Sequence, residues 1–159
     1  MGNQNASDRD MLEHAWRYFA LHAGQRMSIF NFFLVLSGLV AAGLATCLQR
    51  DKPFQLLGTV LGFLLALVSF TFWKLDQRTS FFIKHAEGAI AELEESFPLA
   101  AARLISRERH RTDAAVSSSF VLIRMWTYGS AFRLIFVVMG IVGLGGAAWS
   151  LCRYVDWIK

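Results

Sequence analysis

The sequence contains few residues whose types and spacing suit catalysis. A catalytic site needs a nucleophile, a base or a metal held beside its partners, and the familiar motifs have characteristic spacings. Ser117, Ser118 and Ser119 follow one another without the glycines of a nucleophile elbow, and no glycine-rich phosphate loop occurs. The carboxylates are scattered or fall on a polar helix face. We therefore expect a protein that is not an enzyme and that uses no cofactor.

The signals for a metal site are weak. His14, Tyr18 and His22 share a helical face at four-residue spacing, but two histidines alone seldom hold a metal. Cys47 and Cys152 are a single pair, which cannot build a four-ligand zinc site. We predict no metal site. The two cysteines fall at the same predicted end of their helices, so they are either a disulfide or, the more common case, two small apolar side chains.

A basic cluster is the strongest candidate for ligand binding. Its members are Arg103, Arg107, Arg109, His110 and Arg111. Guanidinium groups suit a phosphate or another anionic ligand. Beside a membrane, however, such a cluster more often contacts anionic lipid. Both interpretations stay open, and we expect no direct binding of nucleic acid.

These residues belong to a chain that is too apolar for an ordinary soluble domain, with 55% hydrophobic and 18% charged residues. Three stretches, 27–48, 54–73 and 134–152, contain no Asp, Glu, Lys or Arg. As helices, each is long enough to cross about 30 Å of hydrocarbon. A buried core helix is usually shorter and carries a polar stripe. The sequence therefore predicts an all-α integral membrane protein with three transmembrane helices and a cytoplasmic helical segment.

Five parts follow along the chain. Residues 1–26 are predicted to form an amphipathic helix in the cytoplasm or at the membrane surface, because apolar positions recur there at helical spacing after a serine cap at Ser7. Residues 27–73 form a helical hairpin, turned at 49–53. The second span should continue as a stalk into a cytoplasmic helical region, 74–130, in which Pro98 ends the stalk. The third span is 131–152, and 153–159 form a short extracytoplasmic tail.

The basic residues predict the orientation of the spans. Of the 16 Lys and Arg, only Arg50, Lys52, Arg153 and Lys159 lie in the hairpin turn or the C-terminal tail. The others precede the first span or lie between the second and third. The positive-inside rule therefore places the N-terminus and the central region in the cytoplasm and the C-terminus outside it.

Small residues recur on one face of each predicted span, where they let another helix approach closely. The members are Gly38 and Ala42 in the first span, Gly58, Gly62 and Ala66 in the second, and Gly140, Gly143 and Ala147 in the third. These faces either close a three-helix monomer or, in part, meet other subunits.

Among the polar residues within the spans, we single out Asn31, Gln55, Thr59 and Ser69. Amides are costly in lipid, so the side chains of Asn31 and Gln55 should face protein or water. We predict that these four line a pore or are buried polar contacts. The spans hold no charge, which argues against a proton-coupled transporter and leaves a weakly selective pore or a passive anchor.

Two segments resemble small bacterial inner-membrane proteins. Residues 16–38 read WRYFALHAGQRMSIFNFFLVLSG, and after the hairpin residues 73–79 read WKLDQRT. This layout is similar to the RipA-like octameric membrane proteins and to the two-span SLATT-type effectors of nucleotide-signalling antiphage systems. The resemblance implies a ring-like assembly in the inner membrane and, for the effectors, membrane disruption after a signal made during infection. The third span departs from the two-span plan.

Our leading hypothesis is an oligomeric membrane effector of bacterial antiphage defence that permeabilises or perturbs the inner membrane after a cytoplasmic signal. Its expected partners are the lipid bilayer, further copies of itself up to an octamer, and a cytoplasmic defence protein or nucleotide signal. The alternative is a non-conducting scaffold or anchor that positions a cytoplasmic partner.

Overall fold

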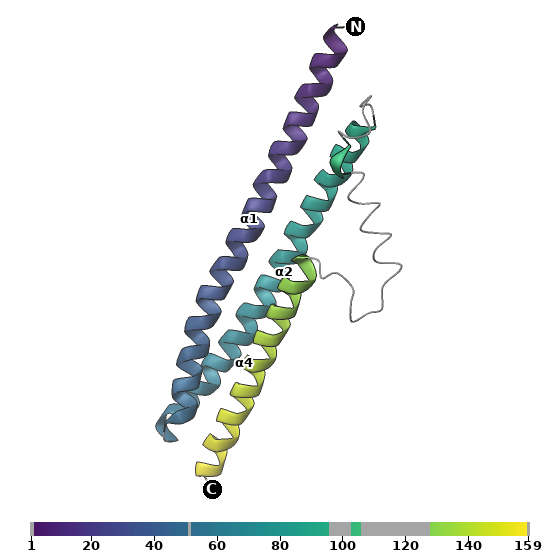
Figure 1. The fold of residues 1–159 in the computed structure, drawn as a ribbon. Coiled ribbons are helices and arrows are strands. Elements are labelled where there is room, and N and C mark those ends of the chain that lie inside the picture. Colours follow the sequence, from purple (N-terminus) through teal and green to yellow (C-terminus); the bar gives the residue numbers. More distant parts are fainter. Residues whose placement is uncertain (1, 51, 96–102, 106–127, 159) are drawn as a thin grey trace, which may run out of the picture. The chain divides into compact units, whose positions relative to one another are not determined.

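Long helices make up nearly all of the computed structural model. It describes residues 2–50, 52–95, 103–105 and 128–158. The elements are α1 (Gly2–Gln49), the 3-10 helix η1 (Lys52–Phe54), α2 (Gln55–Glu94) and α4 (Tyr128–Ile158) (Figure 1). The described part of the chain is all-helical, as predicted, and α2 continues past residue 74 as expected. Of the predicted cytoplasmic helical region, 74–130, residues 96–102 and 106–127 lie outside the described residues.

The chain divides into two compact units, which we treat separately. The span unit comprises Met27–Gln77 and Tyr128–Lys159, and the flanking unit comprises Met1–Arg26 and Arg78–Thr127. The span unit contains the apolar parts of α1, α2 and α4. The flanking unit contains the start of α1 and the end of α2.

Within the described residues, three helical segments are long and apolar enough to cross a membrane. They are Arg9–Gln49, Gln55–Glu94 and Gly129–Asp156, and only 22%, 28% and 22% of their most apolar windows is buried. Most of their apolar side chains therefore face outward, including Phe32, Val35 and Leu39, which are each more than 70% exposed. A bundle made for water would turn such side chains inward, whereas one made for lipid exposes them.

Glycines bring α2 and α4 into backbone contact. A Cβ added to Gly62 would lie 2.6 Å from the carbonyl oxygen of Gly143, and one added to Gly143 would lie 2.7 Å from that of Gly62. Neither position has room for a side chain. Ala66 and Ala147 flank this crossing. The backbone nitrogen of Ala66 would lie 2.8 Å from a Cβ on Gly143, and that of Ala147 would lie 2.6 Å from a Cβ on Gly62. The predicted small-residue faces of the second and third spans therefore meet each other within one chain.

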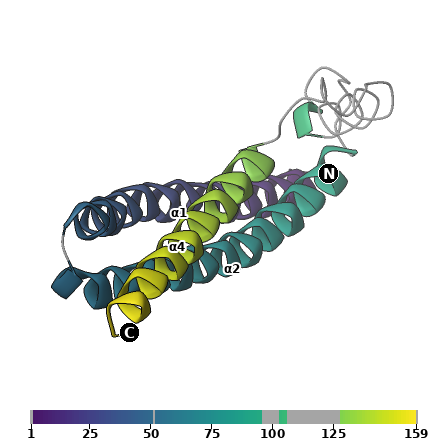
Figure 2. The ribbon, with the colours of Figure 1, turned by 90° about the horizontal axis from the view of Figure 1, so that it is seen from below.

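The α1 helix joins this pair through larger side chains. Leu44, which is 2% exposed, fills the space above Gly146, and the Leu61 side chain lies beside Gly43. Figure 2 shows α4 against both α1 and α2.

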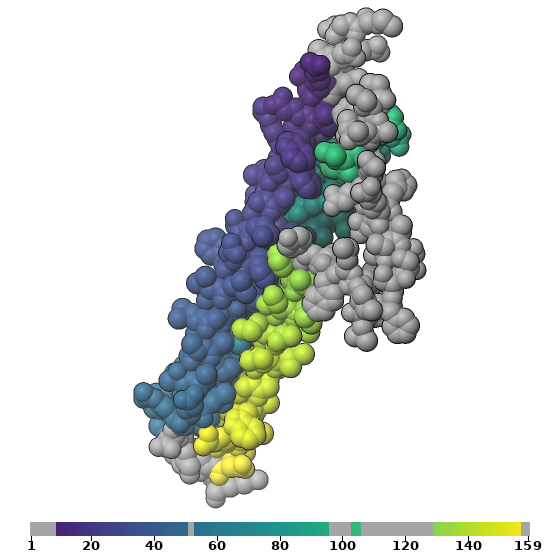
Figure 3. All heavy atoms as spheres, viewed as in Figure 1, coloured from purple at the N-terminus to yellow at the C-terminus, as the bar shows by residue number. Residues whose placement is uncertain are grey.

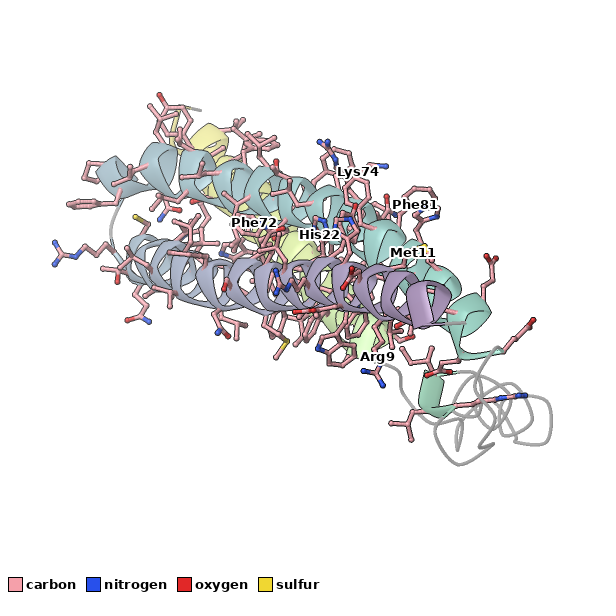
Figure 4. All side chains as sticks on the ribbon, turned by 90° about the horizontal axis from the view of Figure 1, so that it is seen from above. Arg9, Met11, His22, Phe72, Lys74 and Phe81 are labelled. Carbon is pink, nitrogen blue, oxygen red and sulfur yellow. The ribbon has the colours of Figure 1, made fainter. Side chains whose placement is uncertain are left out.

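Rings pack at the other end of the span unit. The Phe30 and Phe132 rings stack with centroids 3.9 Å apart, and Phe33, which is fully buried, contacts the rings of Phe136 and Phe72. Figure 4 shows Phe72 turned toward α1. Aromatic pairs thus hold α1 to its two neighbours at this end.

The α2–α4 crossing should be the most sensitive point of the span unit. Gly62→Leu forces the two backbones apart and should destabilise the detergent-solubilised protein by about 1–3 kcal/mol, the usual cost of overpacking. Gly145→Leu is the matched control, because nothing lies within 4 Å of a Cβ at Gly145. Thermal or denaturant unfolding followed by circular dichroism measures both. Equal stability of the two variants would contradict this packing.

Candidate functional site

The polar residues within the spans form the candidate site, and two of them connect α2 to α4. Ser150 Oγ lies 3.0 Å from the main-chain oxygen of Gln55 and 2.9 Å from its Oε1, so the hydroxyl can donate to either. Gln55 Nε2 in turn donates to the Arg50 carbonyl at 3.1 Å. Both side chains are at most 1% exposed. This polar contact ties the turn after α1 to α2 and α4.

Thr59 and Ser69 are buried along the same side of α2. Their hydroxyls donate to carbonyls one turn earlier, Thr59 to Gln55 at 3.0 Å and Ser69 to Leu65 at 2.8 Å. The Ser69 side chain faces α4, since its Cβ lies 3.6 Å from a Cβ placed on Gly140. The structure therefore places Gln55, Thr59 and Ser69 inside a single chain, with hydrogen bonds to protein groups. Whether they also line a pore stays a prediction.

Asn31 does not join these residues. It is exposed, as are Gly38 and Ala42 further along α1, and nothing lies within 4 Å of a Cβ at Gly38. The small-residue face of the first span thus contacts neither α2 nor α4. Contact of this face with other subunits stays a prediction.

An ion pair joins the start of α4 to α2. Arg133 Nε lies 3.7 Å from Oδ2 of Asp76, whose side chain is 2% exposed, whereas that of Arg133 is 47% exposed. Lys74 precedes Asp76 by two residues. Its side chain lies over the rings of Phe70 and Trp73 and points away from the bundle in Figure 4. Lysine and tryptophan commonly mark a membrane–water interface in this way. The ion pair therefore lies at one predicted end of the spans.

Sequence reasoning missed both inter-helix polar contacts. Asp76 lies just beyond the second uncharged stretch and Arg133 just before the third, so their matching positions were the available signal. Ser150 follows Gly143 and Ala147 along the third span, and nothing in its spacing distinguishes a hydroxyl that meets Gln55 from one that bonds its own helix.

The structure describes only Arg103 of the predicted basic cluster. The Arg103 side chain donates to the carbonyl of Glu95 at 3.1 Å, and the Ile105 amide donates to Glu94 Oε1 at 3.1 Å. Arg107, Arg109, His110 and Arg111 lie outside the described residues. An anionic ligand at this cluster therefore stays a prediction.

The histidines and cysteines of the described part fit packing roles. The His22 ring contacts Tyr18 and Phe82, with centroids 4.3 and 5.3 Å away, and its Nδ1 lies 3.0 Å from Gln25 Oε1. In the ranges that the structure describes, no group of three metal-binding side chains occurs. Cys47 is buried and Cys152 is exposed, and both thiols are free. The structure therefore has two separate cysteine side chains and not a disulfide.

Removal of the Arg133 guanidinium should destabilise the span unit, because the carboxylate of Asp76 is buried. We expect Arg133→Gln to lower the free energy of unfolding by about 1–3 kcal/mol, and Asp76→Asn in the same chain to recover part of that loss. The control is Arg17→Gln, whose exposed pair with Glu13 should contribute about 1 kcal/mol or less. A double-mutant cycle in detergent gives the coupling energy. If the effects of Arg133→Gln and Asp76→Asn on the free energy of unfolding are strictly additive, the two side chains do not interact and the ion pair is contradicted.

Comparison with known proteins gives one informative relative. No family model matches the chain, and no solved structure matches it. CD-NTase-associated protein 19 of Escherichia coli is 42% identical over 134 residues, which cover 83% of this chain and 85% of that protein. The relation does not place the chain in the RipA-like or SLATT groups, so those resemblances stay predictions. At this identity and coverage the chain belongs to the family of CD-NTase-associated protein 19.

Proposed function

We propose that the chain is an oligomeric effector of antiphage defence that lies in the bacterial inner membrane and perturbs it after a cytoplasmic signal. Membership of the family of CD-NTase-associated protein 19 is the observation that carries the role in defence. The family name supports a partnership with a CD-NTase, whose signal would reach the proposed cytoplasmic side of this chain. The protein acts without catalysis, because its sequence holds no motif for a reaction.

The outward apolar surface of the three helices supports the membrane location. Such an extensive apolar surface is unfavourable in water and matches the hydrocarbon of a bilayer. The basic residues support an N-terminus and a 74–130 region in the cytoplasm, with the C-terminus outside it.

The outward face of α1 supports self-association. Asn31, Gly38 and Ala42 recur at intervals of seven and four residues on this face and are exposed in the described part of the chain, where nothing lies within 4 Å of a Cβ at Gly38. In lipid, small residues favour helix association by close packing, and an amide adds a hydrogen bond between helices. An α1-to-α1 contact between copies would use this exposed small-residue face.

The buried polar residues of the spans bear on how permeabilisation would work. Gln55, Thr59, Ser69 and Ser150 all have hydrogen-bond partners inside one chain. A pore lined by these residues would require a second arrangement, in which copies rearrange or the α2–α4 contact opens. Both α1 and α2 contribute residues to the span unit and to the flanking unit, so each offers a route for a signal.

The alternative function is a non-conducting anchor that positions a cytoplasmic partner. The observation that favours it is the same complete pairing of Gln55, Thr59, Ser69 and Ser150 within the chain. Membrane potential distinguishes the two functions. In cells that express the chain with its CD-NTase system, phage infection should collapse the potential if the chain is an effector, and a potential that persists while defence holds would favour the anchor.

Substitution on the outward face of α1 tests self-association. Gly38→Leu with Ala42→Leu should weaken it about tenfold, roughly 1.4 kcal/mol, because the helices can no longer approach closely. Ala148→Leu adds similar bulk at an exposed position of α4 and serves as the control. Energy transfer between labelled copies in liposomes measures the association constant. An unchanged constant in the α1 variant would exclude this interface.

A further inference from the structure

A groove runs between α1 and α4 at the end of the span unit that carries η1. It has a volume of about 500 Å³ and is lined on α1 by Ala41, Ala45 and Leu48 and on α4 by Val142, Gly145 and other residues. This volume falls within the roughly 300–1,000 Å³ range of small-molecule sites. Figure 3 shows the blue part of α1 and the yellow part of α4 side by side.

The groove exists because small residues line its walls while a large one fills its floor. Leu44 meets Gly146 at the base, where a Cβ on the glycine would lie 2.7 Å from the leucine side chain. Ala45 and Gly145 have no bulk to close the space above them. Trp149 forms one edge of the groove and is 63% exposed. The lining is mostly apolar, so an apolar occupant suits it.

A cation stands at the terminal end of this groove. Arg153 lies one turn after Trp149 on the same face of α4, and its Nη1 donates to the carbonyl oxygen of Leu48 at 3.2 Å. That carbonyl is one of the last four of α1, which have no acceptor role within the helix. The bond fixes the guanidinium beside the groove, and because a guanidinium has five N–H groups, others are left to bind an anion.

We propose that this groove binds an acyl chain of a phospholipid whose phosphate lies against Arg153, with a preference for an anionic headgroup. An apolar channel that ends at a fixed, exposed cation matches the two parts of such a lipid. Trp149 suits the boundary between them, because tryptophan favours the level of the headgroups. The site depends on membrane insertion and does not depend on effector activity.

A second copy of the chain fits this groove less well. Copies inserted in the same orientation would meet with the same ends together, so a symmetric contact here would bring Arg153 of one copy toward Arg153 of the other. Like charges oppose such a contact. A lipid phosphate supplies the opposite charge.

Native mass spectrometry of the detergent-solubilised full chain tests the site, with phosphatidylglycerol and phosphatidylcholine of identical acyl chains as the probes. The wild type should retain phosphatidylglycerol about fivefold better than phosphatidylcholine. Arg153→Gln should abolish that preference. Arg50→Gln is the control, because this arginine lies at the same end of the unit but stacks on Phe54 and does not line the groove. Equal retention of both lipids by the wild type, or the same effect in both variants, would overturn the proposal.

Steric block of the groove gives a readout that is independent of charge. Gly145→Leu has room for its side chain in the monomer and should lower the retention of both lipids. Unchanged retention in this variant would place the lipid elsewhere. Cross-linking between copies through Ala45→Cys, in a chain with Cys47→Ser and Cys152→Ser, would show that a second copy fills the groove and would also overturn the proposal.

Discussion

The rest of the span unit depends on the backbone contact between α2 and α4. Gly62 and Gly143 approach so closely that neither can carry a side chain. Close approach matters in lipid because apolar side chains gain nothing from leaving hydrocarbon for one another, so association rests on packing and on polar contacts. Once α2 and α4 are paired, the hydroxyl of Ser150 contacts Gln55, and the side chain of Leu44 packs against Gly146.

The helices could be predicted from the sequence because charge is expensive in hydrocarbon. Stretches 27–48, 54–73 and 134–152 lack charge, and they lie in α1, α2 and α4 of the structure, except that Phe54 belongs to η1. Spacing also identified which face of the second span is small. It could not identify the partner of that face, because glycine at every fourth position specifies close approach and not which helix approaches. The choice between a monomer contact and a subunit contact therefore needed the structure, which assigns Gly62 to the first.

Polar contacts between helices were harder to predict. A charged residue at the end of a span is usually solvated by headgroups, so the positions of Asp76 and Arg133 do not by themselves predict an ion pair. Asn31 was expected to face protein or water, and it lies on the exposed face of α1. The amide of Gln55, which also needs hydrogen-bond partners, finds them inside the chain in the Arg50 carbonyl and the Ser150 hydroxyl. Composition sets the requirement for each amide, and only the packing of the helices shows how it is met.

The proposed function combines family membership with an apolar outer surface, and insertion in the membrane is its central claim. The most direct measurement is fractionation of cells that express the full chain, with alkaline carbonate extraction followed by detergent. The account predicts that the chain stays in the membrane pellet at high pH and is released only by detergent. Recovery of folded protein in the supernatant after ultracentrifugation without detergent would contradict it.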